Sequence, residues 1–246
     1  MIVTTSNQIL NVVPTIQVDA GAGEVPANIT DPDHSLTYTS GTATSAFRVG
    51  FGVQEDISYV ALSGHNAALT TDATISIHDE AVLIASATVS RNHNLVITFP
   101  IQDFTDLRVT FAITPNNQAT TISYIAAGTY IEVPRGEQSG YSRQWLKRQI
   151  TSKTSTNLLA APTGITQKRK ALKGNLVIPN QTVDFIETLW QEFIDFTYEQ
   201  PFFIKEDDSK PESSYICYDP QHDVKANAQT RTLVNASMKF SAYNGL

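Results

Sequence analysis

The chain has 246 residues and a formal net charge of −7. Hydrophobic residues make up 41% and charged residues 17%, both slightly below the usual share in globular proteins, and no low-complexity tract occurs. This length suits one large domain or two ordinary ones. The composition therefore argues against a disordered or fibrous protein and favours a folded protein with a polar surface.

Cysteine usage and the N-terminus narrow the class of protein further. Cys217 is the only cysteine, so the chain cannot form an internal disulfide or a multi-cysteine zinc site. It has no basic neighbour in sequence, which predicts an inert core thiol. No basic region followed by an apolar stretch opens the chain, and no run of about 18 apolar residues occurs. We therefore expect no membrane insertion and a protein made and kept soluble in a cytoplasm.

The net charge is divided unevenly along the chain. Residues 1–133 have three basic side chains against twelve carboxylates, which gives −9. Residues 134–173 have nine basic side chains against one carboxylate, or +8, and residues 174–246 have five against eleven, or −6. The first change of sign coincides with residues 134–140, whose Pro, Gly and polar content is typical of a linker. We therefore predict a first domain at 1–133, a basic linker or contact arm at 134–173, and a second domain at 174–246.

The first of these parts shows short β-type runs separated by turn-forming residues. The clearest strand is predicted at 107–113, where Leu107, Val109, Phe111 and Ile113 alternate with more polar residues. Further strands are predicted at 47–51, 57–62, 74–78, 81–89, 95–99 and 121–125. Closely spaced short strands with turns between them are typical of a sandwich or jelly roll. We predict a jelly-roll β-sandwich for residues 1–133.

The last part contains the clearest helix of the chain, predicted at 182–198. Apolar residues recur there at the spacing of one helical face: Val183, Ile186, Trp190, Phe193, Ile194. Asn180 or Thr182 can cap its free amides. Strands are predicted at 202–204, 215–218 and 233–243. The predicted fold class is mostly β, with an N-terminal jelly-roll β-sandwich and a smaller C-terminal α+β domain that has one amphipathic helix.

Catalytic, cofactor and metal motifs are missing. The sequence has no G-x-S-x-G, H-E-x-x-H, P-loop or Rossmann glycine pattern. Residues 31–34 offer oxygen and nitrogen ligands for a metal, but a capped turn is the more common role of such residues. The carboxylates at 206–208 suit metal or acid/base chemistry, but a solvated hairpin turn is favoured. We expect no catalytic residue, no cofactor, no metal and no enzymatic activity.

His65 and Asn66 form a candidate ligand loop. They follow a predicted strand, where polar loop side chains can contact a sugar. The same residues also suit a tight turn, and the sequence leaves both roles open.

The basic segment provides the candidate assembly interface. Its members are the basic and aromatic residues Arg143, Trp145, Lys147, Arg148, Lys168, Arg169 and Lys170. Such residues can bind nucleic acid through phosphate contacts and stacking. The rest of the chain is acidic, however, and no nucleic-acid-binding motif accompanies them. We therefore do not expect nucleic acid as a partner and favour contact with acidic surfaces of neighbouring subunits.

Two parts of the chain resemble known families. Residues 47–51, 57–66 and 107–111 resemble the galactose-binding-like, discoidin-type jelly roll of many phage and cell-surface proteins, and residues 124–131 resemble its closing strand. The helix that contains Phe185, Trp190 and Phe193, followed by 201–204 and an acidic turn, resembles the end of distal-tail-type proteins of tailed bacteriophages. Together the two matches cover most of the chain.

The resemblance implies a structural virion protein of a phage tail tip or baseplate. Such a protein forms a homo-oligomeric ring, often a hexamer, between tail tube and tip, contacts other phage tail proteins, and is assembled in the host cytoplasm. The jelly roll would then be an outward or docking module, and the basic segment a contact arm. The alternative is a carbohydrate-binding module for a host-surface glycan, although disulfides and an evident aromatic platform are missing. A weaker alternative, a hydrolase acting on the host envelope, depends on the carboxylates at 206–208 alone.

Overall fold

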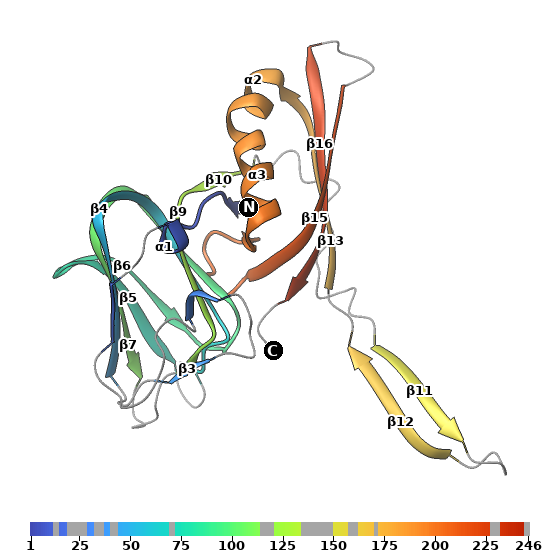
Figure 1. Ribbon diagram of the computed structural model, residues 1–246, viewed down its shortest axis with the longest axis horizontal. Coiled ribbons are helices and arrows are strands. Elements are labelled where there is room, and N and C mark those ends of the chain that lie inside the picture. Colours follow the sequence, from blue (N-terminus) through green and yellow to red (C-terminus); the bar gives the residue numbers. More distant parts are fainter. Residues whose placement is uncertain are drawn as a thin grey trace.

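The computed structural model describes residues 1–11, 15–18, 29–31, 37–39, 44–68, 72–113, 121–133, 150–156, 162–169, 172–226 and 232–243. These residues form a β-sandwich, a second sheet covered by a helix, and a separate two-stranded hairpin (Figure 1). Every strand pair among them is antiparallel. The predicted fold class, mostly β with a sandwich and one long helix, is confirmed.

The sandwich has the strand order β2-β4-β7-β5-β6, with β9 paired to β4. Its strands are β2 (Thr15–Val18), β4 (Thr44–Ser63), β5 (Ala73–Asp79), β6 (Val82–Val89), β7 (Leu95–Ile113) and β9 (Tyr124–Gly128). The short strands β3 (Tyr38–Thr39) and β8 (Thr121–Ile122) pair with each other, and the one-turn helix α1 (Gln8–Asn11) lies against β9.

Strands β4 and β7 are long because each one bends and belongs to both layers. The first half of β4 pairs with the second half of β7, and the second half of β4 pairs with the first half of β7 and with β9. Irregularities in the β4–β7 register between Gly50 and Glu55 and between Ile57 and Tyr59 mark the bend, as bulges do at the corners of sandwiches. The strands predicted separately at 47–51 and 57–62 are therefore parts of one strand. Apolar residues from the two layers enclose the core between them.

The second sheet has the strand order β10-β1-β14-β15-β16-β13. Its strands are β1 (Ile2–Thr4), β10 (Tyr130–Glu132), β13 (Leu172–Thr182), β14 (Phe202–Lys205), β15 (Ser214–Ala226) and β16 (Leu233–Tyr243). Strands β1 and β10 come from the segment predicted for the first domain, yet they lie in the second sheet, where β1 pairs with both β10 and β14. The chain thus leaves the second sheet after β1, forms the sandwich, and returns to the second sheet at β10. The predicted linker at 134–140 lies outside the described residues.

One face of the second sheet is covered by a continuous helix of three segments, α2 (Val183–Phe185), the π-helical η4 (Ile186–Trp190) and α3 (Gln191–Glu199). The Thr182 hydroxyl accepts a hydrogen bond from the Phe185 amide at 3.1 Å, so Thr182 is the N-cap. Trp190 and Phe193 are buried as predicted, whereas Val183 and Leu189 are 45% and 44% exposed. The wider π turn changes the angular position of the residues around it, so a strict 3.6-residue spacing predicts the wrong face for Val183. No helix among the described residues is long and apolar enough to cross a membrane.

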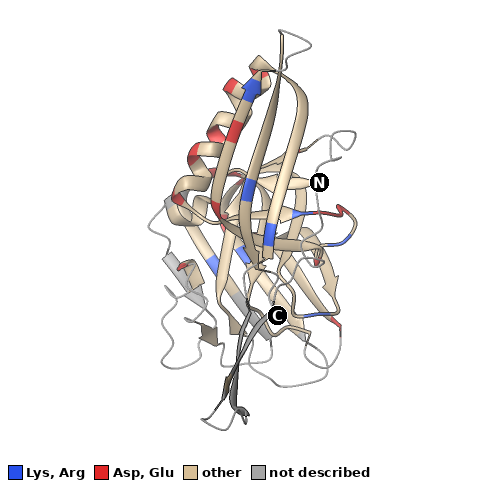
Figure 2. Ribbon diagram, turned by 90° about the vertical axis from the view of Figure 1, so that its right-hand side faces the viewer, with Lys and Arg blue, Asp and Glu red and all other residues tan. Residues whose placement is uncertain are grey.

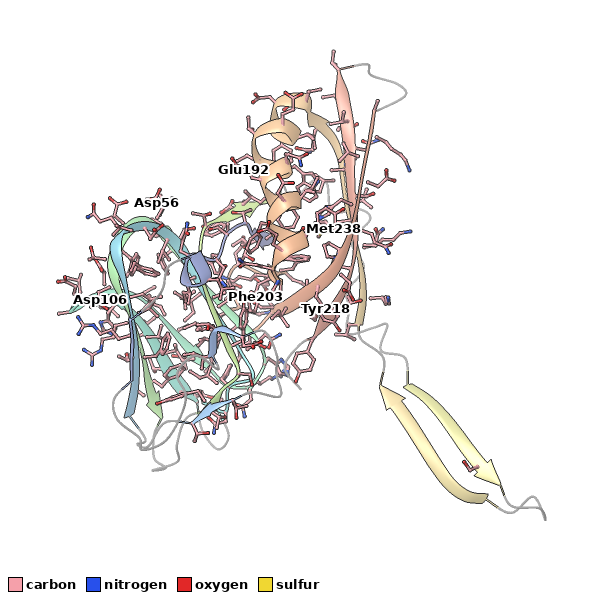
Figure 3. The ribbon with its side chains drawn as sticks, in the orientation of Figure 1. Asp56, Asp106, Glu192, Phe203, Tyr218 and Met238 are labelled. Atoms are coloured by element: carbon pink, nitrogen blue, oxygen red, sulfur yellow. The ribbon has the colours of Figure 1, made fainter. Side chains whose placement is uncertain are left out.

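The sandwich and the second sheet are in contact through aromatic and aliphatic side chains. Tyr124 of β9 stacks on Phe203 of β14, with ring centroids 6.2 Å apart and planes 9° apart. Figure 3 shows Phe203 at this junction. Tyr59 and Tyr124, both buried, keep their hydroxyls satisfied, because Tyr59 donates to the Ser6 carbonyl at 2.6 Å and Tyr124 accepts from the Asn7 amide at 3.0 Å. This junction has the apolar packing of a core, which favours a fixed arrangement of the two bodies.

The hairpin consists of β11 (Ile150–Thr156) and β12 (Pro162–Arg169). Within the described residues these strands pair only with each other. Figure 1 shows the hairpin projecting away from both the sandwich and the second sheet. It lies inside the basic segment predicted as a contact arm.

Candidate functional site

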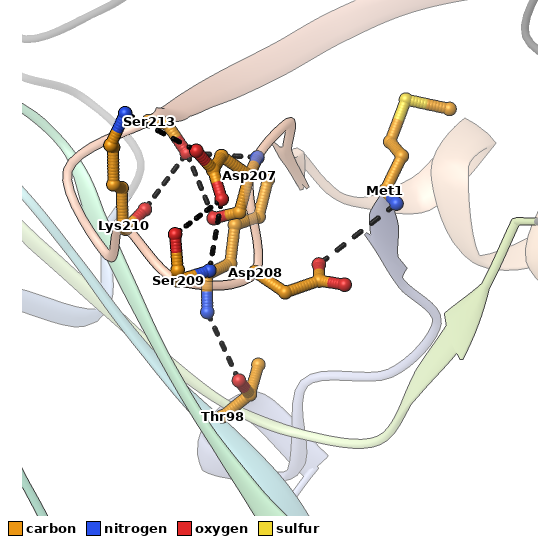
Figure 4. Close-up of polar contacts among 8 residues, drawn as sticks. Met1, Thr98, Asp207, Asp208, Ser209, Lys210 and Ser213 are labelled. Carbon is orange, nitrogen blue, oxygen red and sulfur yellow. Dashed lines mark hydrogen bonds and ion pairs between the residues drawn. The ribbon is translucent and has the colours of Figure 1, made fainter. Parts of the chain in front are cut away.

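In the turn between β14 and β15, residues 206–213, the Asp207 carboxylate makes several contacts. Asp207 accepts hydrogen bonds from the amide and the hydroxyl of Ser209 at 3.0 and 2.7 Å, and its carboxylate lies 3.4 Å from the Lys210 ammonium (Figure 4). The hydrogen bonds from Ser209, with the Lys210 charge, lower the pKa of Asp207. These are the contacts of a hairpin turn, the role that the sequence favoured over acid/base chemistry.

The same turn is attached to the sandwich. Glu212 accepts hydrogen bonds from the backbone amides of Ser90 and Arg91 at 2.7 and 2.6 Å. The Val96 amide of β7 donates to the Pro211 carbonyl at 2.9 Å. Backbone contacts therefore fix the turn beside β6 and β7, two strands that are more than 100 residues away in sequence.

A cavity of about 300 Å³ lies between this turn and the sandwich. Residues of β6, β7, β14 and the turn line it: Ser86, Ala87, Thr88, Val96, Ile97, Thr98, Lys205, Asp208, Ser209 and Pro211. This volume is at the lower end of the range for small-molecule sites. Most of the lining side chains carry a hydroxyl or a charge, so the cavity suits a small polar ligand.

Lys205 is the most unusual residue of the cavity. The residue is 3% exposed, and its ammonium donates one hydrogen bond, to the Thr98 hydroxyl at 3.0 Å. An ammonium has three N–H donors, and Lys205 forms no other hydrogen bond or ion pair within the described part of the chain. Burial lowers the pKa of Lys205, against the opposing effect of the Asp208 and Asp207 carboxylates. The structure thus places a poorly compensated positive charge at the cavity, which is costly without a partner.

Asp208 lines the cavity together with Lys205. One of its carboxylate oxygens lies 3.9 Å from the N-terminal amino group of Met1 (Figure 4). The cavity is therefore lined by the Lys205 ammonium and by the Asp208 carboxylate, which lies near a second cation, the N-terminal amino group.

The candidate ligand loop at His65 and Asn66 is built differently. His65 is 3% exposed, its Nε2 lies 2.6 Å from the His93 carbonyl, and its Nδ1 accepts a hydrogen bond from the Ala67 amide at 3.4 Å. Burial lowers the pKa of His65 to about 4, so the ring is neutral at pH 7. Asn66 accepts a hydrogen bond from the Thr121 amide at 2.8 Å. These contacts are those of a tight turn, and both ring nitrogens of His65 are occupied.

The structure describes only part of the predicted assembly interface. Lys168 and Arg169 lie on β12, opposite Thr151 and Ile150 of β11. Five predicted interface residues lie outside the described residues: Arg143, Trp145, Lys147, Arg148 and Lys170. Of the residues at 31–34, only Asp31 is described, and it is exposed. Within the described ranges no group of three or more His, Cys, Asp or Glu side chains is arranged to hold a metal ion.

Sequence reasoning considered Asp208 but missed Lys205 and Thr98. Residues 202–204 predicted an apolar strand, and Lys205 extends that strand by one residue. Alternation along β14 places Lys205 on the same side as Phe203, toward the sandwich, which is a detectable signal once the strand is known. Cys217 is fully buried, burial raises its pKa, and its contacts are those of a core thiol.

Comparisons with known proteins find likeness only in solved structures. No family model matches the chain, and no curated protein matches it. The CBM32 of AlyQ, solved in complex with 4,5-unsaturated mannuronic acid, is 20% identical with a TM-score of 0.39, over 47% of this chain and 94% of that chain. Chitosan-binding module 1 of a chitosanase/glucanase from Paenibacillus sp. IK-5 is 16% identical with a TM-score of 0.42, over 50% and 99%.

The third structure is a fucosidase, and this chain resembles only part of it. The GH29 fucosidase of Ruminococcus gnavus, solved in complex with fucose, is 12% identical with a TM-score of 0.43, over 52% of this chain and 27% of that chain. Identities and TM-scores this low, in all three structures, do not indicate the ligand or the activity of this chain.

Proposed function

We propose that the chain is a non-enzymatic structural protein of a phage tail tip, which forms a ring with copies of itself between tail tube and tip and acts in the virion. The observation that supports this proposal is a projecting basic hairpin on a protein whose own helix is acidic. The family resemblance of the helix and the strand after it supports the phage setting.

The hairpin is suited to contact with another chain. Strands β11 and β12 contain Lys153, Lys168 and Arg169 and no carboxylate. An isolated two-stranded hairpin is at best marginally stable in water, so burial against a neighbouring surface stabilises it. Its positive charge favours an acidic surface as that neighbour.

The helix of a second copy offers such a surface. Residues 183–199 contain five carboxylates and no basic side chain, and all five are exposed: Asp184, Glu187, Glu192, Asp195 and Glu199. Figure 2 shows the acidic positions spread along the helix. A contact between the hairpin of one copy and the helix of the next is head-to-tail, and repeated head-to-tail contacts form a ring when the rotation between copies closes.

Charge reversal tests this contact. We expect the wild-type chain to form a ring, and we expect two double variants, K153E/K168E on the hairpin and D195K/E199K on the helix, to be monomeric in native mass spectrometry. In an equimolar mixture the introduced hairpin glutamates of one variant can pair with the introduced helix lysines of the other, so rings with alternating copies are expected to form again. Lys239→Glu reverses the charge of one lysine on the exposed side of β16 and should leave assembly intact. A monomeric wild type, or rings that persist in both double variants, would overturn the proposal.

The second candidate function is binding of a host-surface glycan. The observation that favours it is the cavity between the sandwich and the 206–213 turn, because hydroxyl and charged side chains line it. A glycan array probed with the full chain and with Thr98→Ala tests this function. Binding that Thr98→Ala weakens supports it, and an array without hits removes its support.

A further inference from the structure

We infer that the cavity beside Lys205 binds a small hydroxylated carboxylate, a compound of the sugar-acid class, with its carboxylate on the Lys205 ammonium. This inference deepens the glycan-binding candidate and does not depend on ring assembly. It names both the chemical class of the ligand and the residue that selects it.

The first step is the charge of Lys205. A buried charge is strongly unfavourable unless an opposite charge or several hydrogen bonds compensate it. Thr98 supplies one neutral acceptor for three donors, and the Lys205 side chain lines the open cavity. An anion in the cavity would supply the missing acceptors. Charge-assisted hydrogen bonds of this kind are stronger than neutral ones.

The second step is the rest of the lining. The hydroxyls of Ser86, Thr88 and Ser209 line the cavity together with Thr98. Hydroxyls both donate and accept, which matches the hydroxyl groups of a sugar ring. Ala87, Ile97 and Pro211 provide apolar surface between these groups, as in most small-molecule sites.

The third step selects among anions. Asp208 lines the same cavity, and Asp207 is close enough to affect the charge of Lys205. Two nearby carboxylates repel a doubly charged anion more than a singly charged one. A monoanionic carboxylate is therefore favoured over phosphate. The Asp208 carboxylate can also accept a hydrogen bond from a ligand hydroxyl, a group that acetate lacks.

Isothermal titration calorimetry of the full chain tests the inference with four probes: D-galacturonate, D-galactose, acetate and inorganic phosphate. We expect D-galacturonate to bind at least about tenfold more tightly than the other three, because only it combines a carboxylate with the hydroxyl groups of a sugar ring. In Lys205→Met, which keeps an unbranched side chain one atom shorter and removes its charge, galacturonate affinity should fall by at least about tenfold. Lys210→Met removes an exposed lysine from the same turn and should retain the affinity.

The stability of Lys205→Met provides a second readout. Without ligand this variant should unfold at the same temperature as the wild type or a higher one, because a poorly compensated buried charge has been removed. Galacturonate should raise the unfolding temperature of the wild type only. Equal binding of galactose and galacturonate would refute the inference and leave glycan binding intact. Failure of both sugars to bind would refute the inference, while the glycan array decides the glycan-binding candidate separately. Tighter binding of phosphate than of galacturonate would also refute the inference.

Discussion

At the scale of single residues, two equally buried polar side chains differ in how many of their hydrogen-bonding groups have partners. His65 and Lys205 are both 3% exposed. Both ring nitrogens of His65 have partners, whereas the Lys205 ammonium has one hydrogen bond for three donors. A buried side chain whose hydrogen-bonding groups all have partners is typical of a structural role. A buried side chain with unpaired donors beside a cavity is typical of a binding role. Burial and polarity alone would not have separated the two.

The buried His65 and the half-buried His222 predict a loss of stability in mild acid. Burial lowers the pKa of both His65 and His222 to about 4, from the ordinary value of 6.5. Between these values the unfolded chain binds protons that the folded chain does not, so the free energy of unfolding falls as the pH drops from 6.5 toward 4. For His65 alone the loss amounts to about 2 to 3 kcal/mol at pH 4.5. Urea denaturation at pH 7, 5.5 and 4.5 measures it.

The variant His65→Gln isolates this effect. It should lower the stability at pH 7, because the contacts of the turn change, but its stability should depend less on pH than that of the wild type. His78→Gln is the control, since His78 is less buried than His65. A pH dependence in His65→Gln as steep as in the wild type would contradict the assignment.

At the scale of elements, the helix depends on one cap and on its contact with the second sheet. Phe193 packs edge-to-face on Phe202 of β14, with ring centroids 5.4 Å apart, and Trp190 contacts Phe193 at 4.9 Å. Figure 3 shows Glu192 on the helix and Met238 on the sheet that the helix covers. The buried side of the helix is aromatic while its exposed side is acidic. Changes to the exposed side can therefore alter assembly without loss of the fold.

Thr182→Ala should destabilise the protein by about 1 kcal/mol, because it removes the hydroxyl that caps the Phe185 amide. The matched control is Thr188→Ala in the same helix, whose hydroxyl donates only to the Asp184 carbonyl at 2.7 Å on an exposed surface. The control should change stability by less than about 0.5 kcal/mol. Urea denaturation compares the two variants, and equal losses would show that the cap contributes nothing specific.

At the scale of the whole molecule, the sandwich is inserted between two neighbouring strands of the second sheet. Strand β1 pairs with both β10 and β14, so the chain crosses between the two bodies twice at adjacent positions. The Tyr124–Phe203 stack and the attachment of the 206–213 turn add contacts on the same side. Two covalent connections and an apolar junction together favour unfolding of both bodies in one step.

Phe203→Ala should separate this single transition into two. The substitution removes a buried aromatic side chain from the junction, at a cost of about 3 to 5 kcal/mol, and weakens the coupling between the bodies. Phe104→Ala, within the sandwich core, should cost a similar amount but keep a single transition. Differential scanning calorimetry measures both. A single transition in Phe203→Ala would mean that the bodies unfold together without this contact.

Local patterns in the sequence determined much of the fold. Alternation predicted the strand at 107–113 and the one at 233–243, and the cap residue with its apolar spacing predicted the helix within one residue at each end. These features depend on neighbours within a few residues, which the sequence displays directly. The segregation of charge, and with it the contrast between a basic hairpin and an acidic helix, is also a property of the sequence alone.

Only the tertiary structure decided which distant segments meet. The sequence did not reveal that Ile2–Thr4 belongs to the second sheet, because the pairing of a three-residue strand depends on partners about 130 and 200 residues away. The candidate site has the same origin: Lys205 and Thr98 are 107 residues apart, and neither is unusual until the turn brings them together. Whether a charge is buried and compensated depends on the packing of several distant strands. No periodic pattern of apolar residues in the sequence predicts that packing.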